Sequence, residues 1–176
     1  LVFSNLVYNF YGKAQPENIC AVTGTSGKSS VVDFVRQIWG LLKIPTISLG
    51  TIGIVAENVY TSKKTLKSTD ADYTTPVNGE VYKFLRYFKD KGVKHAAVEI
   101  SSHGLEQYRL ANIKVKAAGF TNLGTDHLDF YNGDSKAYLN AKAKLFKENL
   151  NKDGTAVLNA DIKEFDYLKN ICESRG

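Results

Sequence analysis

The stretch AVTGTSGKSS, residues 21–30, joins an apolar run to a glycine-rich turn that ends in Gly27, Lys28 and Ser29. The common phosphate-loop pattern, G-x-x-x-x-G-K-[ST], has a glycine where Val22 stands here, and this chain has Gly24 inside the loop instead. The turn follows a predicted strand and precedes a predicted helix, the context that a phosphate loop requires. We therefore predict a nucleotide site with unusual spacing; the alternative is a helix that is merely capped by a serine.

The predicted loop offers several kinds of group to a nucleotide. Its backbone N–H groups and the positive end of the following helix suit phosphate oxygens. The Lys28 ammonium would reach the β- and γ-phosphates, and the Ser29 hydroxyl would bind Mg²⁺. The residues expected to bind the phosphates are Gly24, Thr25, Ser26, Gly27, Lys28, Ser29 and Ser30.

Strand-like and helix-like segments alternate on both sides of the loop. Apolar, β-branched runs predict strands at 18–24, 44–55, 94–100, 115–121 and 154–160, the second of them with a glycine turn. Apolar residues at helical spacing predict helices at 1–11, 29–43, 76–91, 135–150 and 161–175, and the polar segment 57–72 is expected to be a hairpin or loop. This order predicts an α/β fold: a three-layer P-loop domain with a mainly parallel sheet flanked by helices. Such sheets bind ligands beyond the carboxyl ends of their strands.

Two of the predicted helices carry more specific expectations. The apolar face of helix 29–43 is expected to consist of Val32, Val35, Ile38, Trp39 and Leu42. In the stretch YTTP, Thr75 is expected to be the N-cap of helix 76–91, with Pro76 in its first turn. Thr74 and Thr75 would then lie at a positive helix end, which suits an anionic substrate.

The composition excludes several classes of partner. Hydrophobic residues make up 43% of the 176 residues, and the bases behind the net charge of +5 are spread along the chain, so a nucleic-acid interface is not expected. No apolar run reaches the roughly 18 residues of a membrane span, so no membrane partner is expected. Cys20 and Cys172 are expected to be buried thiols in a reducing compartment. Because the chain starts at Leu1 and contains no methionine, we expect a piece of a longer protein.

Polar residues follow two of the predicted strands. Glu99 ends the apolar run AAVEI, and a buried carboxylate at that place resembles the acidic element that holds Mg²⁺ in P-loop proteins. The alternative is an edge strand on which Glu99 reaches water. Asp126, His127 and Asp129 crowd the loop after the fourth strand, where they would ligate a metal, orient a phosphate or cap a turn.

Lys142 lies on the apolar stripe of the predicted helix 135–150, together with Tyr138, Ala141 and Leu145. A lysine on such a stripe either extends its ammonium to the solvent or has a chemical role. Its amine can react with CO₂ to form a carbamate, which would turn the cation into a carboxylate-like metal ligand.

The pieces TGTSGKSS, LGTIG, TTP, EISSHGLEQYR, TNLGTDHLDF and YLNAKAKLF occur in this order between residues 23 and 146. Their order resembles that of the Mur ligase family, most closely of the members that add the third residue to the peptidoglycan stem peptide. SSHGLEQYR is the most specific piece. The family loop has no glycine at the position of Val22, so the resemblance accounts for the spacing. Ser26, Ser29 and Thr125 stand where the family usually has asparagine, threonine and arginine.

The resemblance implies roles for the candidate residues. Ser29 and Glu99 would hold one Mg²⁺, His127 and carbamylated Lys142 would serve a second, and Lys28 would act with His127 and Lys142 in catalysis. The residues implied to contact the UDP-MurNAc-dipeptide are Thr74, Thr75, Ser101, Gln107 and Arg109. Diaminopimelate or lysine would be the amino acid that is added.

The resemblance also implies a domain organisation. Residues 1–15 would be an N-terminal helix and linker, and residues 16–176 the central ATP-binding domain of a cytoplasmic ligase, expected to be a monomer. By itself this domain is expected to lack ligase activity. The alternatives are a folylpolyglutamate-synthase-like ligase domain and an ATP-binding module without turnover.

Overall fold

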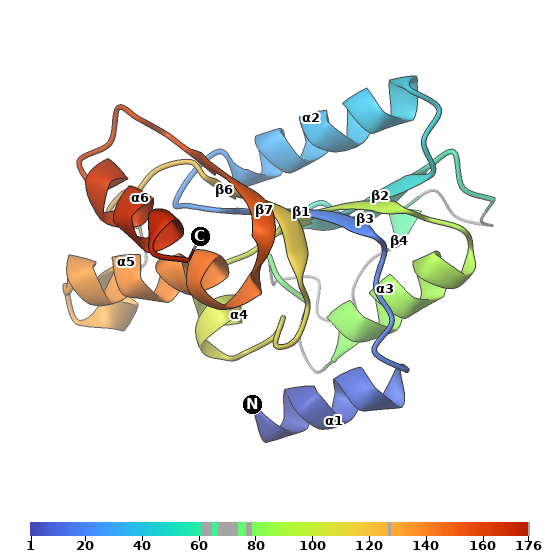
Figure 1. The fold of residues 1–176 in the computed structure, drawn as a ribbon, viewed down its shortest axis with the longest axis horizontal. Helices are drawn as coiled ribbons and strands as arrows, with labels where there is room; N and C mark the ends of the chain where they lie inside the picture. The colour runs from blue at the N-terminus through green and yellow to red at the C-terminus, as the bar shows by residue number, and fades with distance from the viewer. Residues whose placement is uncertain (61–64, 67–73, 77–78, 127, 176) are drawn as a thin grey trace.

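The computed structural model describes residues 1–60, 65–66, 74–76, 79–126 and 128–175. Its centre is a seven-stranded sheet with the order β4-β3-β2-β5-β1-β6-β7 (Figure 1). Neighbours from β2 to β7 in this order pair in parallel, whereas β3 and β4 are antiparallel. The strands are β1 Asn18–Thr23, β2 Thr46–Gly50, β3 Gly53–Glu57, β4 Thr65–Leu66, β5 His95–Glu99, β6 Val115–Phe120 and β7 Leu150–Leu158. The predicted α/β fold with a mainly parallel sheet is confirmed.

Helices cover the sheet on both sides and complete three layers. In Figure 1, α2 lies alone over one face, while α3, α4 and α5 lie under the other and α1 lies beyond α3. The helices are α1 Val2–Phe10, α2 Lys28–Leu41, α3 Glu80–Asp90, α4 Ser102–Glu106, α5 Ser135–Lys144 and α6 Phe165–Glu173. Because both faces of the central strands are covered, their sequences are continuous apolar runs rather than alternating ones.

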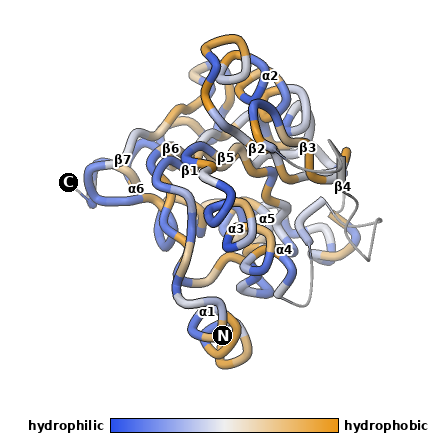
Figure 2. Tube along the Cα trace, turned by 90° about the vertical axis from the view of Figure 1, so that its right-hand side faces the viewer, coloured by the Kyte–Doolittle hydropathy of each residue, from blue (hydrophilic) through white to orange (hydrophobic). Residues whose placement is uncertain are grey.

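The outermost helix, α1, carries its apolar side chains on the surface. Figure 2 shows this helix as a hydrophobic segment at the periphery. Leu6 and Phe10 are exposed, while Val7 packs against the core and the Tyr8 ring lies 5.9 Å from that of Tyr82 in α3. The predicted helix is therefore confirmed, and its contact with the domain uses a small part of its apolar surface.

Helix α2 turns a different face to the sheet than the apolar pattern predicts. Ile38 and Leu42 are 56% and 65% exposed, whereas the buried positions are Val32, Arg36 and Gly40. These three recur every fourth residue and face the strands, so the predicted face is wrong at Ile38 and Leu42. The reason is a close approach at Gly40, where a Cβ would overlap the Glu57 carboxylate.

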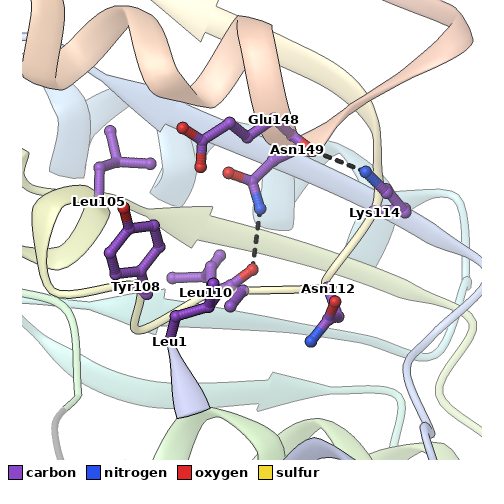
Figure 3. Close-up of a pocket in the computed structure, with 9 residues that line it drawn as sticks. Leu1, Leu105, Tyr108, Leu110, Asn112, Lys114, Glu148 and Asn149 are labelled. Carbon is purple, nitrogen blue, oxygen red and sulfur yellow. Dashed lines mark hydrogen bonds between the residues drawn. The ribbon is translucent and has the colours of Figure 1, made fainter. Parts of the chain in front are cut away.

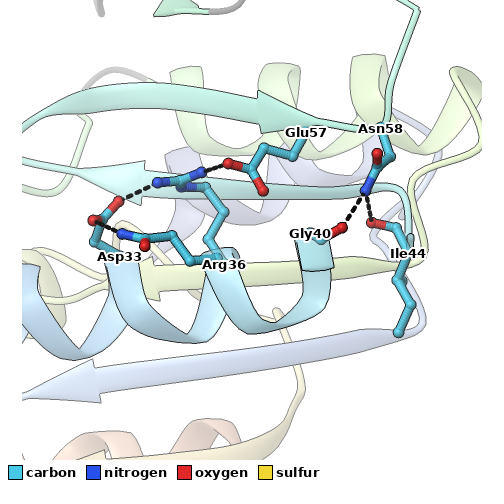
Figure 4. Close-up of polar contacts among 7 residues, drawn as sticks. Asp33, Arg36, Gly40, Ile44, Glu57 and Asn58 are labelled. Atoms are coloured by element: carbon cyan, nitrogen blue, oxygen red, sulfur yellow. Dashed lines mark hydrogen bonds and ion pairs between the residues drawn. The ribbon is translucent and has the colours of Figure 1, made fainter. Parts of the chain in front are cut away.

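A polar network explains why the buried face of α2 contains Arg36 rather than an apolar residue (Figure 4). Its guanidinium donates to Asp33 one turn away and to Glu57 at the end of β3. The Asn58 amide donates to the carbonyl of Gly40 at 2.9 Å, which satisfies an acceptor near the end of the helix. The network therefore fastens α2 to the β2–β3 hairpin.

The remaining differences from the predicted elements concern segment ends. The run 44–55, expected to be a strand with a glycine turn, forms two strands of a hairpin, and its turn lies at Gly50 to Gly53. Helix 135–150 ends as an α-helix at Lys144 and continues as a π-helical turn, Leu145–Asn149, into β7. Helix α3 begins after its N-cap Gly79, so the predicted start at Thr75 and Pro76 is wrong. The Thr75 hydroxyl instead accepts a hydrogen bond from the Ser101 N–H.

Two further expectations can be compared with the described residues. Cys20 and Cys172 are half-buried free thiols, less enclosed than expected. In the part of the chain that the structure describes, no helix is long and apolar enough to cross a membrane.

Candidate functional site

The loop after β1 has the backbone geometry of a tight strand-to-helix turn. Gly24 and Gly27 have φ angles of +140° and +82°, which residues with side chains rarely adopt. At Gly24 a Cβ would also overlap the Thr121 hydroxyl. Val22 lies inside β1, paired with Glu99 of β5 and Gly119 of β6. The position that lacks the common glycine is therefore a buried strand position, and the tight turn begins two residues later.

The segment that follows β6 holds this loop in place. Asn122 accepts from the Ser26 N–H through its side chain at 2.9 Å and from the Thr25 N–H through its backbone carbonyl at 2.9 Å. The Thr121 hydroxyl donates to the Ser26 carbonyl at 2.7 Å. Sequence reasoning missed both residues, although the quoted piece TNLG contains them. The Asn122 side chain thus bonds to both backbone groups of Ser26: its oxygen accepts from the Ser26 N–H, and its nitrogen donates to the Ser26 carbonyl.

Lys28, at the start of α2, folds back over the loop. Its ammonium donates to the Thr25 carbonyl at 2.8 Å. Burial lowers the pKa of Lys28, and the negative charges of Glu99 and Asp126 act in the opposite direction. A cation is thus held beside the loop, where phosphate oxygens would meet it.

Glu99 is a buried carboxylate at the carboxyl end of the central strands, the end of the sheet that carries the phosphate loop. It ends β5, between β2 and β1, and is 2% exposed, so the alternative of a water-exposed edge position is wrong. The carboxylate accepts from the Ser29 hydroxyl at 2.8 Å, from the Thr51 N–H at 3.1 Å and from the Thr51 hydroxyl at 3.2 Å. No ion pair among the described residues includes Glu99. A buried carboxylate with neutral donors alone is suited to receive a cation.

Lys142 is buried on the other side of the phosphate loop. It is 2% exposed, and its ammonium donates to the Gly24 carbonyl at 2.8 Å while lying 4.3 Å from the centre of the Tyr138 ring. The alternative of a lysine that extends to solvent is therefore wrong. Burial, reinforced by the positive charge of Lys28, lowers the pKa of Lys142 to about 7. A lowered pKa favours the unprotonated amine, which is the form that carbamate formation requires.

The acidic loop after β6 is described only in part. Asp126 and Asp129 are exposed, and His127 lies outside the described residues. Within the described residues, no group of three or more histidine, cysteine, aspartate and glutamate side chains is placed to hold a metal ion. Mg²⁺ usually binds through few protein carboxylates together with waters and substrate phosphates. The oxygens of Glu99 and Ser29 fit that mode.

The residues expected to contact the acceptor substrate lie together beside Glu99. The Arg109 guanidinium donates to the Thr75 carbonyl at 2.5 Å and to the Gln107 side chain at 2.7 Å. The Thr75 hydroxyl accepts from the Ser101 N–H at 3.0 Å, and Ser101 in turn caps α4. Thr74 is linked through its hydroxyl to Thr51 at 3.2 Å. The structure thus brings Thr74, Thr75, Ser101, Gln107 and Arg109 into one connected cluster.

A cavity of about 180 Å³ lies at the opposite edge of the sheet (Figure 3). It is located where β6 and β7 begin. The Asn149 amide donates to the carbonyls of Leu110 and Ile113 at 2.8 and 2.9 Å, and the Lys114 ammonium donates to the Glu148 carbonyl at 2.6 Å. These polar groups are occupied in holding the chain together, so the cavity is not the candidate site. It is lined by Leu1, Leu105, Tyr108, Leu110, Ala111, Asn112, Lys114, Glu148 and Asn149.

The chain is similar in sequence to known proteins. Residues 22–176 match the Mur ligase middle domain. The chain is 43% identical over 174 residues to a UDP-N-acetylmuramoyl-L-alanyl-D-glutamate--2,6-diaminopimelate ligase of Anaplasma marginale (strain St. Maries), covering 99% of this chain and 35% of that protein. It is 46% identical over 151 residues to the ligase of the same name from Chelativorans sp. (strain BNC1), covering 86% of this chain and 29% of the relative. The chain thus spans about a third of the length of these relatives.

Solved structures give the same result. A structure of a UDP-N-acetylmuramoyl-L-alanyl-D-glutamate--2,6-diaminopimelate ligase has a TM-score of 0.74 at 30% identity, over 97% of this chain and 32% of that one. A bifunctional folylpolyglutamate synthase/dihydrofolate synthase from Yersinia pestis c092, complexed with AMPPNP and Mn ion, has a TM-score of 0.71 at 15% identity, over 100% of this chain and 45% of that one. The second similarity concerns the fold alone.

Proposed function

Since the chain belongs to the Mur ligase family, as its middle domain, we propose that it binds ATP for an amide-forming ligase of peptidoglycan-precursor synthesis. One observation carries the proposal. The buried Glu99 carboxylate joins the phosphate loop, through Ser29, to the cluster around Thr75, through Thr51 and Thr74. A phosphate-binding element and an acceptor-binding cluster thus meet at one carboxylate, as transfer of a phosphoryl group between two substrates requires.

In this proposal the phosphate loop and Lys28 bind the β- and γ-phosphates of ATP. Lys28 exchanges its present bond to the Thr25 carbonyl for a charge-assisted bond to phosphate. Ser29 and Glu99 hold Mg²⁺, which when bound would neutralise charge on the phosphates. A second Mg²⁺ is assigned to His127 and Lys142, with Lys142 as a carbamate. Because ATP is the proposed donor, the cytoplasmic location expected from the sequence belongs to the proposal as well.

The proposed acceptor is UDP-MurNAc-L-Ala-D-Glu. The ligases named among the relatives favour diaminopimelate over lysine as the added amino acid. The γ-phosphoryl group would pass to the free carboxylate of D-glutamate, and the amine would then displace phosphate from the acyl phosphate. Thr74, Thr75, Ser101, Gln107 and Arg109 would orient the acceptor. Such a transfer depends on positioning and electrostatic stabilisation more than on covalent help from side chains.

The alternatives are separable by experiment. A folylpolyglutamate-synthase-like ligase shares the fold at 15% identity and would turn over a pterin substrate. We expect the 176-residue chain to bind ATP without forming an amide, because it spans about a third of the length of its relatives. Amide formation by this chain alone would contradict that expectation.

The test of ATP binding is calorimetry with Lys28→Ala. Loss of a phosphate-binding ammonium is expected to weaken ATP binding at least about 100-fold, in line with a lost charge-assisted interaction of about 3 kcal/mol. Lys152→Ala is the matched control, because Lys152 is exposed on β7 at the far side of the sheet. Unchanged affinity in Lys28→Ala would reduce the loop to a structural turn.

A further inference from the structure

The turn of the β2–β3 hairpin places one residue, Thr51, against the Glu99 carboxylate. Its N–H donates to Oε1 at 3.1 Å, and its hydroxyl lies 3.2 Å from Oε2. The Ser29 hydroxyl also donates to Oε2, at 2.8 Å. Both carboxylate oxygens are therefore oriented by Thr51, whereas Ser29 reaches a single oxygen.

The local sequence makes this approach possible. Gly50 precedes Thr51, and a Cβ at Gly50 would overlap the Glu99 carboxylate. Gly53 has a φ of +101°, which lets the chain reverse directly after the turn. The two glycines of LGTIG thus bring the backbone of the hairpin tip close to Glu99, and Thr51, the first of the two residues between them, presents its N–H and hydroxyl there.

Thr51 also connects Glu99 to the cluster of residues around Thr75 that is proposed to bind the acceptor substrate. Its hydroxyl lies 3.2 Å from the Thr74 hydroxyl as well as 3.2 Å from the carboxylate. A hydroxyl carries one proton, and a bond to an ionised carboxylate is the stronger use of it. The Thr51 hydroxyl is thus a donor that faces two acceptors, the Glu99 carboxylate and the Thr74 hydroxyl, and the carboxylate is the stronger of the two. Thr75, the next residue, is held by Ser101 and Arg109, so this end of the chain of hydrogen bonds is fixed.

We propose that Thr51 is a positioning residue that fixes the Glu99 carboxylate in the orientation for a divalent cation and links that carboxylate to Thr74. The inference rests on the proposed function, because the cation accompanies the nucleotide. Partners that orient a metal-binding carboxylate commonly change metal affinity by about 10- to 100-fold when they are removed. Removing the hydroxyl of Thr51 should therefore weaken the contribution of the metal, and leave the contacts of the phosphate loop unchanged.

The experiment measures the affinity of the 176-residue chain for AMPPNP by calorimetry, once with Mg²⁺ and once with EDTA. The ratio of the two dissociation constants gives the gain in affinity due to Mg²⁺. Thr51→Val keeps the shape and the N–H of residue 51 and removes its hydroxyl; we expect a gain about 10-fold smaller, with the affinity in EDTA unchanged within about twofold. Thr51→Ser restores the hydroxyl and is expected to restore the gain.

Thr155→Val is the matched control, since Thr155 is exposed on β7 at the other edge of the sheet. A full Mg²⁺ gain in Thr51→Val would overturn the positioning role and leave the proposed function intact. Equal weakening with Mg²⁺ and with EDTA would also overturn it, because Thr51 would then act on the loop or on folding. A wild-type chain that binds AMPPNP under neither condition would overturn the proposed function and this inference together.

Discussion

Two regions beside helix α2 contain buried charges, and the partners of these charges differ between the two regions. Under the middle of the helix, the Arg36 guanidinium is paired with the carboxylates of Asp33 and Glu57. At the carboxyl edge, Glu99 and Lys142 are each 2% exposed and are bonded to neutral groups. Neither takes part in an ion pair within the described ranges. A buried charge balanced by opposite charges fastens elements together, whereas one with neutral partners alone is costly until a ligand supplies the counter-charge.

The largest expected difference between the regions concerns Lys142 and pH. Burial lowers its pKa to about 7, while an unfolded lysine titrates near about 10.4. Between these values the unfolded chain binds more protons than the folded chain. The free energy of unfolding should therefore rise with pH across this window, by up to about 1.4 kcal/mol per pH unit.

Urea denaturation in CO₂-free buffer from pH 7 to pH 10 measures this rise. In Lys142→Met the group that titrates is gone, so the difference between wild type and variant should increase steadily with pH in favour of the wild type. If the free energies of unfolding of wild type and variant instead depend on pH in the same way, Lys142 keeps an ordinary pKa. Its burial would then cost as little as that of Arg36.

The second prediction concerns Gly50, which packs against the Glu99 carboxylate. Gly50→Ala places a methyl group where the carboxylate lies, so Glu99 or the hairpin tip must move. We expect a loss of about 2 kcal/mol in the free energy of unfolding from overpacking, together with a smaller Mg²⁺ gain in AMPPNP affinity. Gly119→Ala is the control, because its added Cβ would meet Val22 at an ordinary 3.6 Å. Equal behaviour of the two variants in calorimetry and urea denaturation would speak against tight packing at Glu99.

The third prediction separates the Arg36 region from the site. Arg36→Met leaves the carboxylates of Asp33 and Glu57 without their cation, and both are partly solvated. We therefore expect a loss of about 1–2 kcal/mol in the free energy of unfolding, below the cost of breaking a fully buried pair. AMPPNP affinity in the folded variant should stay within about twofold of the wild type. A large loss of affinity at unchanged stability would show that this network serves the site rather than the fold.

The sequence predicts the parts of this protein in which one signal dominates. The central parallel strands β1, β2 and β5 are largely apolar runs, and Glu99 is conspicuous because it ends one of them. The turn at Gly24 and Gly27 is predictable because glycine is needed there for backbone reasons. The α/β fold and the edge that carries the candidate site follow from these signals.

Other features depend on contacts between distant segments, which no local pattern contains. Helix α3 has Gly79 rather than Thr75 as its N-cap, because the Thr75 hydroxyl is bonded to Ser101 and not to the helix. The face of α2 is set by Arg36, whose partner Glu57 lies in another element. Thr51 resembles any polar turn residue until β2 and β5 are placed side by side.

The most direct test is Glu99→Gln, which keeps the size of the side chain and removes its charge. If the buried carboxylate awaits a cation, the variant should unfold at the same or a higher free energy, by up to about 1 kcal/mol, because an unpaired buried charge is gone. The Mg²⁺ gain in AMPPNP affinity should disappear, with the affinity in EDTA unchanged within about twofold. A destabilised variant that keeps the full Mg²⁺ gain would contradict this and make Glu99 a structural residue like Arg36.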